Sequence, residues 1–160
     1  MRGAKGFSLI ELLIVVAIIL IIAAIAVPNY LHSRELANES GAVAALRTLN
    51  TAQITYNSAY PTVGYASSLA SLGPGSGGTC TPTTANACLI DSVLAGGLKS
   101  GYTFQVTGTS GTPNSTYQFI SSPTQPGMTG TRYFCTFADA VVRFSTAALS
   151  SCDGSVSPQQ

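Results

Sequence analysis

Glu11 is the residue whose type and position most directly suggest chemistry. It lies in an apolar run from Phe7 to Val27 that is interrupted only by Ser8 and Glu11 itself. An unpaired carboxylate in such surroundings is costly, so it tends to find a positive partner and to mark a functional site. The alternative is a snorkelling or locally paired carboxylate with no further role. We favour the first interpretation, because Glu11 is too deep in the run to reach water easily.

The apolar run itself has the length of a membrane span. Its 21 residues would form a helix of roughly 30 Å, which matches the hydrocarbon core of a bilayer. A secretory signal peptide would end in a small-residue cleavage site, which Val27-Pro28-Asn29 does not provide. A plain uncut anchor is a second alternative. The basic leader, residues 1–6, predicts that this end stays cytoplasmic and that the rest of the chain crosses the membrane.

The remaining ionisable residues do not form a recognisable catalytic group. His32 is the only histidine, and Asp91, Asp139 and Asp153 are scattered singly. We therefore expect no enzyme, metal site or cofactor. Charged residues make up 8% of the chain and the formal net charge is +1, which excludes the concentrated basic surface that nucleic-acid binding needs. A membrane-tethered enzyme remains an alternative that would require a polar site beyond the apolar run.

Four cysteines indicate an oxidising compartment. The even number predicts two disulfides. Three pairings are possible, and we favour Cys80–Cys88 with Cys135–Cys152 because each pair closes a local loop. A metal site is disfavoured, since the cysteines have no short spacing of the metal-binding kind and no nearby histidine.

A second helical pattern follows the apolar run. Apolar and large side chains recur every three or four residues, which predicts an amphipathic helix up to Pro61; these residues are Ala42, Leu46, Leu49, Gln53, Tyr56 and Tyr60. The charged residues Arg34, Glu35, Glu39 and Arg47 fall mainly off this stripe. We expect one helix over residues 7–60, with residues 7–27 in the membrane or another apolar environment and the second half packed on a domain.

The last hundred residues are predicted to form an α+β head with that packed half-helix. Residues 61–100 are rich in turn formers and read as a long loop with a short helix near Leu89–Ala95. Four strand patterns follow, at Tyr102–Thr107, Tyr117–Ser121, Arg132–Phe137 and Val141–Ser145. Their short separations favour a four-stranded antiparallel sheet covered by the helix. The head, residues 61–160, would comprise this loop, the sheet and a disulfide-closed C-terminal region.

The string KGFSLIELL at residues 5–13 resembles the N-terminus of type IV pilin precursors. The shared features are a basic leader ending in Gly6, then Phe7, then Glu11 in an apolar helix. Pro28 and Tyr30 also match positions common in type IVa pilins. The resemblance is strong over residues 1–30 and looser in the sheet segments. It implies the pilin fold, and it supports the Cys135–Cys152 pairing, which staples the chain end to the sheet.

The resemblance also implies a maturation and assembly sequence. A prepilin peptidase would cleave the Gly6–Phe7 bond on the cytoplasmic face and methylate the new Phe7 amine. An inner-membrane assembly platform would then move subunits from the membrane into a helical homopolymer, an extracellular pilus whose heads face outward. In that polymer Glu11 of one subunit could meet the Phe7 amine of a neighbour, which would penalise every wrong axial offset.

Two further expectations concern the helix and the kind of filament. Pro28 removes a backbone donor and disturbs the preceding turn, so we expect a bend or local loosening around Ala24–Pro28. The favoured function is a major pilin for adhesion, twitching motility or DNA uptake. The alternatives are a minor pilin or a pseudopilin of a type II secretion system. Major pseudopilins often bind calcium through clustered acidic residues, of which this head has few.

Overall fold

The computed structural model describes residues 7–75 and 80–159. The chain divides into two compact units, one up to Arg34 and one from Glu35 to the C-terminus. The second unit, called the head below, contains the sheet and the packed half of the long helix. The architecture is the α+β, pilin-like fold that the sequence predicts.

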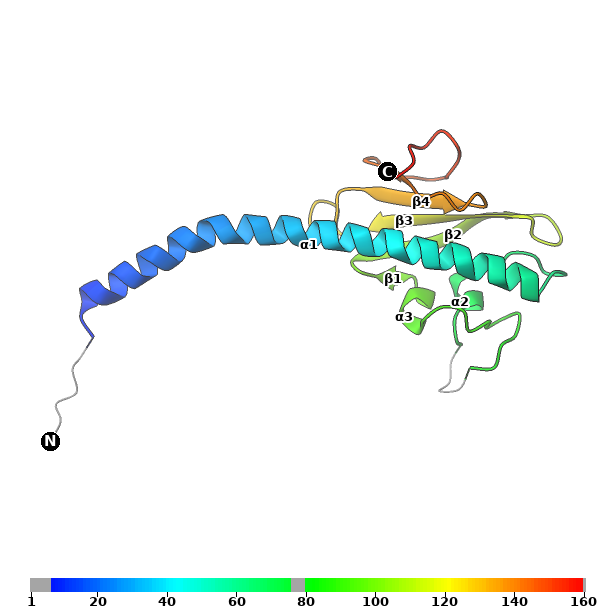
Figure 1. The fold of residues 1–160 in the computed structure, drawn as a ribbon, viewed down its shortest axis with the longest axis horizontal. Helices are drawn as coiled ribbons and strands as arrows, with labels where there is room; N and C mark the ends of the chain where they lie inside the picture. Colours follow the sequence, from blue (N-terminus) through cyan, green and yellow to red (C-terminus); the bar gives the residue numbers. More distant parts are fainter. Residues whose placement is uncertain (1–6, 76–79, 160) are drawn as a thin grey trace. The chain divides into compact units, whose positions relative to one another are not determined.

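Helix α1 spans Leu9–Ala59, 51 residues, and includes Pro28 without a break. Its buried face in the head follows the predicted stripe, because Ala42, Leu46, Leu49, Gln53 and Tyr56 are all at most 2% exposed. Figure 1 shows this half of α1 against the sheet, running roughly alongside the strands. The predicted amphipathic helix is therefore confirmed, with its last residue just before Tyr60 and Pro61.

The sheet has five strands, one more than predicted. The strands are β1 (Leu98–Lys99), β2 (Tyr102–Ser110), β3 (Thr116–Pro123), β4 (Tyr133–Phe137) and β5 (Arg143–Ser145), paired in that order and antiparallel throughout. The additional strand β1 forms because Ser100 and Gly101 both have positive φ, 52° and 71°. Such a pair makes the tight hairpin turn that matches strand twist, so Lys99 pairs with Tyr102.

Two short helices interrupt the long loop before the sheet. Helix α2 (Leu69–Leu72) was not predicted, and helix α3 (Ser92–Ala95) occupies the end of the predicted Leu89–Ala95 segment. Each begins at a capping side chain: Ser68 accepts from the Ser71 amide and Asp91 accepts from the Leu94 amide. Both contribute buried leucines to the core, Leu72 and Leu94.

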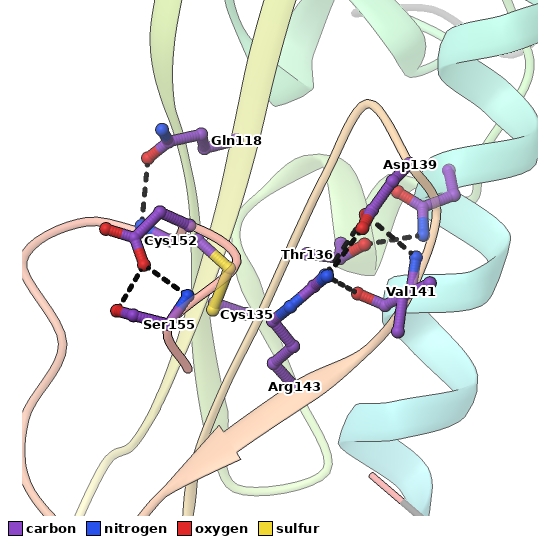
Figure 2. The surroundings of a disulfide bond; sticks show 10 residues. Gln118, Cys135, Thr136, Asp139, Val141, Arg143, Cys152 and Ser155 are labelled. Carbon is purple, nitrogen blue, oxygen red and sulfur yellow. Dashed lines mark hydrogen bonds and ion pairs between the residues drawn. A yellow bond between two sulfur atoms is a disulfide. The ribbon is translucent and has the colours of Figure 1, made fainter. Parts of the chain in front are cut away.

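The C-terminal region covers the face of the sheet opposite α1. Ile120, Cys135 and Cys152 form a second buried cluster there, separate from the core under α1. Figure 2 shows Cys152 joined to Cys135 in this region, with the Cys152 amide donating to Gln118 Oε1 at 3.1 Å. The Cα atoms of the two cysteines are 5.8 Å apart. The other bridge joins Cys80 and Cys88, with their Cα atoms 6.0 Å apart.

A buried polar network fixes α1 against the sheet. Asn50 Nδ2 donates to Thr136 Oγ1 at 2.9 Å, and the Tyr117 hydroxyl donates to Asn50 Oδ1 at 3.3 Å. Burial raises the pKa of Tyr117 to about 12, so its hydroxyl stays a donor at physiological pH. Because buried polar atoms lose much free energy when unpaired, these bonds disfavour other registers of the helix.

Two aliphatic residues on α1 provide a test of this packing. Leu46 is fully buried, whereas Ile54 is 54% exposed. We expect Leu46→Ala to lower the free energy of unfolding of the head by about 2–5 kcal/mol. Ile54→Ala on the same helix should change it by less than about 1 kcal/mol. Chemical denaturation of the full chain in detergent, monitored by tyrosine fluorescence, measures both; equal effects would contradict the assigned helix face.

Candidate functional site

The N-terminal start of α1 places Glu11 in a local hydrogen bond. The backbone amide of Ser8 donates to Glu11 Oε2 at 2.9 Å, and the Leu12 amide donates to the Ser8 carbonyl at 3.2 Å. Ser8 precedes the first helical residue, so Glu11 reaches back to the helix start as the acidic residue of a capping box does. A negative charge in the first turn also interacts favourably with the helix dipole.

Local pairing of Glu11 was the alternative that the sequence analysis did not favour, and the Ser8-x-x-Glu11 spacing is the known signal for it. It satisfies one carboxylate oxygen and leaves the charge in place. Glu11 Oε1 accepts no hydrogen bond within residues 7–75 and 80–159.

Phe7 is 85% exposed, next to the proposed cleavage point. Gly6, the other residue of the predicted cut, lies outside the described residues. The pairing of Glu11 with a Phe7 amine requires a free N-terminus, so it stays a prediction.

The apolar half of α1 buries almost nothing within its own chain. Large apolar side chains from Leu9 to Val27 are between 46% and 80% exposed. This helix is long and apolar enough to cross a membrane, with a mean hydropathy of 3.3 over its best 18-residue window and none of that window buried. The first half of α1 therefore needs a membrane or other protein chains around it.

Pro28 lies inside this helix and is tolerated there. The helical hydrogen-bond pattern extends on both sides of Pro28, up to Ala59. The bend or local loosening expected around Ala24–Pro28 stays a prediction, which a map of an assembled filament would test.

Glu39 corrects the expectation that the charged residues of α1 lie off the buried face. It is 3% exposed, and its Oε1 accepts from the amides of Thr131 and Arg132 while Oε2 pairs with Arg132 Nε at 2.7 Å. Burial alone would raise the pKa of Glu39, but these hydrogen bonds hold it below its ordinary value. The Glu39 clamp, as we call this set of contacts, fastens α1 to the segment that enters β4.

The other ionisable residues considered in the sequence do not converge. His32 is exposed on α1, Asp91 pairs with Lys99 at 2.8 Å, and Asp139 pairs with Arg143 at 2.6 Å (Figure 2). Within the described ranges, no three His, Cys, Asp or Glu side chains are grouped in a way that could hold a metal ion.

The Glu39 clamp gives a prediction for stability. Glu39→Gln keeps the size of the side chain but removes the charge that pairs with Arg132. We expect the free energy of unfolding to fall by about 1–3 kcal/mol, because Arg132 is partly solvated and part of the loss is screened. Asp91→Asn removes an exposed pair and should cost about 0–1 kcal/mol. Urea denaturation of the two variants beside the unmodified chain checks the contrast.

The same variant tests the pH dependence. A carboxylate with a lowered pKa in the folded state contributes stability above its unfolded pKa and loses it as the pH falls through the folded value. The difference in free energy of unfolding between the unmodified chain and Glu39→Gln should thus be largest near pH 7. It should shrink as the pH falls below the ordinary carboxyl pKa of 4.5. A gap that stays constant into acid would contradict the charged clamp.

Comparison with known proteins finds one family match, at the N-terminus, and several curated relatives. The family described as the prokaryotic N-terminal methylation motif matches residues 1–27. The chain is 59% identical over 46 residues to the type IV wide pilus major component PilA4 of Thermus thermophilus, covering 29% of this chain and 35% of that protein. It is 50% identical over 52 residues to the type IV major pilin protein PilA of Myxococcus xanthus, covering 32% of this chain and 24% of that protein.

A third relative belongs to a secretion apparatus. The chain is 42% identical over 65 residues to the type II secretion system core protein G of Vibrio cholerae, covering 39% of this chain and 44% of that protein. The matched segments thus span less than half the length of these relatives. No solved structure matches the chain. The resemblance to type IV pilins is confirmed.

Proposed function

We propose that this type IV pilin-like chain is the structural subunit of a type IV pilus, polymerised into surface fibres for adhesion, twitching motility or DNA uptake. The observation that carries the proposal is the uncovered apolar half of α1, which lies within or next to the matched methylation motif. Such a helix needs apolar surroundings, and a bundle of identical helices supplies them once the subunit leaves the membrane. The pilin relatives are structural subunits, which supports a role other than catalysis.

The proposed maturation divides the chain into three parts. Residues 1–6 are a leader that a prepilin peptidase removes by cutting after Gly6, followed by N-methylation of Phe7. Residues 7–27 anchor the precursor in the inner membrane and later form the filament core. The head is exposed to the periplasm and then to the exterior, where its two disulfides would be stable. The inner-membrane pilus assembly platform is the proposed partner in moving subunits out of the membrane.

Glu11 is the proposed register residue of the assembly. After cleavage, the Phe7 amine of a neighbouring subunit would supply the positive charge that Glu11 lacks. The hydrogen bond from Ser8 holds the carboxylate near the helix start, where such an amine would approach. In water-poor surroundings an unmatched charge is strongly unfavourable, so the pair would select one axial offset between subunits.

Two substitutions at Glu11 separate its local and its intermolecular roles. Glu11→Gln preserves an acceptor for the Ser8 amide, since glutamine also serves in a capping box, but it removes the charge. Glu11→Val removes both. We expect both variants to be inserted and cleaved, and both to give at least about tenfold fewer fibres. Mass spectrometry of the mature N-terminus and electron microscopy of sheared fibres provide the measurements.

The control for this experiment is the cleaved, methylated N-terminus itself. If neither variant is cleaved, a defect before assembly explains the loss of fibres. Normal fibre yield from Glu11→Gln with loss in Glu11→Val would assign Glu11 to helix capping alone. Normal yield from both would remove the proposed role of the residue.

The second candidate function is a pseudopilin of a type II secretion system, which the similarity to core protein G favours. The N-terminal observations support both functions equally. The two functions differ in the phenotype that deletion of the gene should produce. Deleting the gene should abolish surface fibres if the chain is a major pilin, and should abolish protein secretion while leaving fibres intact if it is a pseudopilin. If the chain is a minor pilin, deleting its gene should reduce the number of fibres, and the remaining fibres should still contain the main subunit.

A further inference from the structure

A groove runs beside the packed half of α1. Its volume is about 300 Å³, and its walls include Leu36, Val43 and Arg47 of the helix, with Arg132, Phe134 and Gln159 opposite. The buried Oε1 of Gln159 has no hydrogen-bond donor among the described residues. The groove thus has a mixed apolar and polar lining, with polar groups that an occupant could satisfy.

Charge in this groove is uncompensated at one residue. The Arg132 guanidinium is already paired with Glu39 at 2.7 Å. Arg47 is exposed, and it forms no ion pair within the described part of the chain. An occupant that places a carboxylate near Arg47 would therefore be favoured over a neutral one.

Asp153 is the complementary group on the same head. It is exposed, and the amide and hydroxyl of Ser155 both donate to its Oδ1. Its Oδ2 accepts no hydrogen bond, and its carboxylate enters no ion pair, within residues 7–75 and 80–159. Three other carboxylates of the head are engaged in ion pairs, namely Glu39 with Arg132, Asp91 with Lys99 and Asp139 with Arg143.

The position of Asp153 is well fixed and accessible. The preceding residue, Cys152, is tied to β4 by its disulfide to Cys135 and to β3 by its bond to Gln118 (Figure 2). The following residue, Gly154, has open space around its Cα. A carboxylate held at such a turn loses little conformational entropy when it binds.

The groove and the Asp153 turn lie on different surfaces of the head. The groove borders α1, which covers one face of the sheet, whereas Cys152 packs on the opposite face with Ile120 and Cys135. A contact between two different patches of identical chains is heterologous, and it builds an open helical filament when it does not close into a ring.

We propose that Arg47 in this groove receives the Asp153 carboxylate of a second copy of the chain. The proposal rests on the pilus function proposed above. It adds a heterologous contact between the heads of two subunits, outside the apolar helix bundle. The contact selects one neighbour orientation through charge rather than through buried area. It is also expected to weaken as ionic strength rises.

Charge reversal in the full-length chain tests the pair. Arg47→Glu and Asp153→Arg should each reduce the yield of sheared fibres by about tenfold, through like-charge repulsion. The double variant restores opposite charges and should return the yield to within about twofold of the unmodified chain. Thr55→Glu, which places the same negative charge on an exposed position about two turns further along α1, should leave the yield unchanged. Since Arg47 forms no ion pair within residues 7–75 and 80–159, Arg47→Glu should unfold in detergent like the unmodified chain.

A cross-linking experiment identifies the partner atoms directly. Arg47→Lys keeps the charge and makes the position reactive toward a carbodiimide-activated carboxylate. Purified fibres of this variant should yield a peptide linking position 47 to Asp153. Detergent-dispersed monomers of the variant and fibres of the unmodified chain should yield none.

The outcomes separate this inference from the pilus function. If the unmodified chain makes no fibres, the proposed function fails and the contact with it. If it makes fibres but Arg47→Glu matches it in yield, the contact is wrong and the pilus function stands. If the double variant is not rescued, or position 47 links to another carboxylate or to another protein, Asp153 of a second copy is not the occupant.

Discussion

The uncovered apolar half of α1 is the constraint on which the rest of the structure depends. Burying one large aliphatic side chain contributes about 1.5–3 kcal/mol, and side chains such as Leu9, Ile21 and Ile25 are each more than 60% exposed. Taken over all the large apolar side chains from Leu9 to Val27, the burial free energy exceeds the total stability of an ordinary domain, about 5–15 kcal/mol. The first half of α1 therefore needs apolar surroundings. In the proposed function these are first the membrane and then the neighbouring helices of the filament.

The head, in contrast, buries its own apolar side chains and does not depend on a membrane or a neighbouring chain for its core. Its core under α1 is closed by fully buried side chains such as Leu46, Tyr102 and Phe134. One edge of the sheet is covered by the chain's own end, where the Phe144 amide donates to the Ser157 carbonyl and the Gln159 amide donates to the Val142 carbonyl. Covering this strand edge would matter for the proposed filament subunit, because an open edge can pair with the sheet of another chain.

The sequence predicted the parts of the fold that follow from periodic burial. The stripe from Ala42 to Tyr56 and the strand patterns from Tyr102 onward repeat with the periods of a helix and of half-buried strands. It failed where a few polar contacts decide the outcome. Strand β1 depends on the positive φ angles of Ser100 and Gly101, which are poorly encoded by hydrophobic pattern.

Glu39 shows the same limit within the candidate sites. A glutamate in an amphipathic helix is normally assigned to the solvent side, and only the structure reveals that Thr131 and Arg132, more than ninety residues later, surround it with donors. Long-range pairing of this kind leaves no local periodicity to detect. Glu11, by comparison, could be identified early, because a single charge within an apolar run is conspicuous without any tertiary information.

The structure sharpens the argument about Glu11 by adding its hydrogen bond to Ser8. A backbone amide is neutral, so this bond orients the carboxylate and solvates one oxygen while the net charge remains. In the proposed precursor, the Ser8 amide would offset part of the cost of placing this charge in apolar surroundings. Inside a helix bundle the rest of this cost remains, and only a cation restores the balance. Cleavage beside Phe7 would create such a cation, the Phe7 amine, on every subunit. The oriented carboxylate of Glu11 could then meet the Phe7 amine of a neighbouring subunit. In the proposed assembly, the local bond and the intermolecular pair would be successive roles of one side chain, the first preparing the geometry that the second requires.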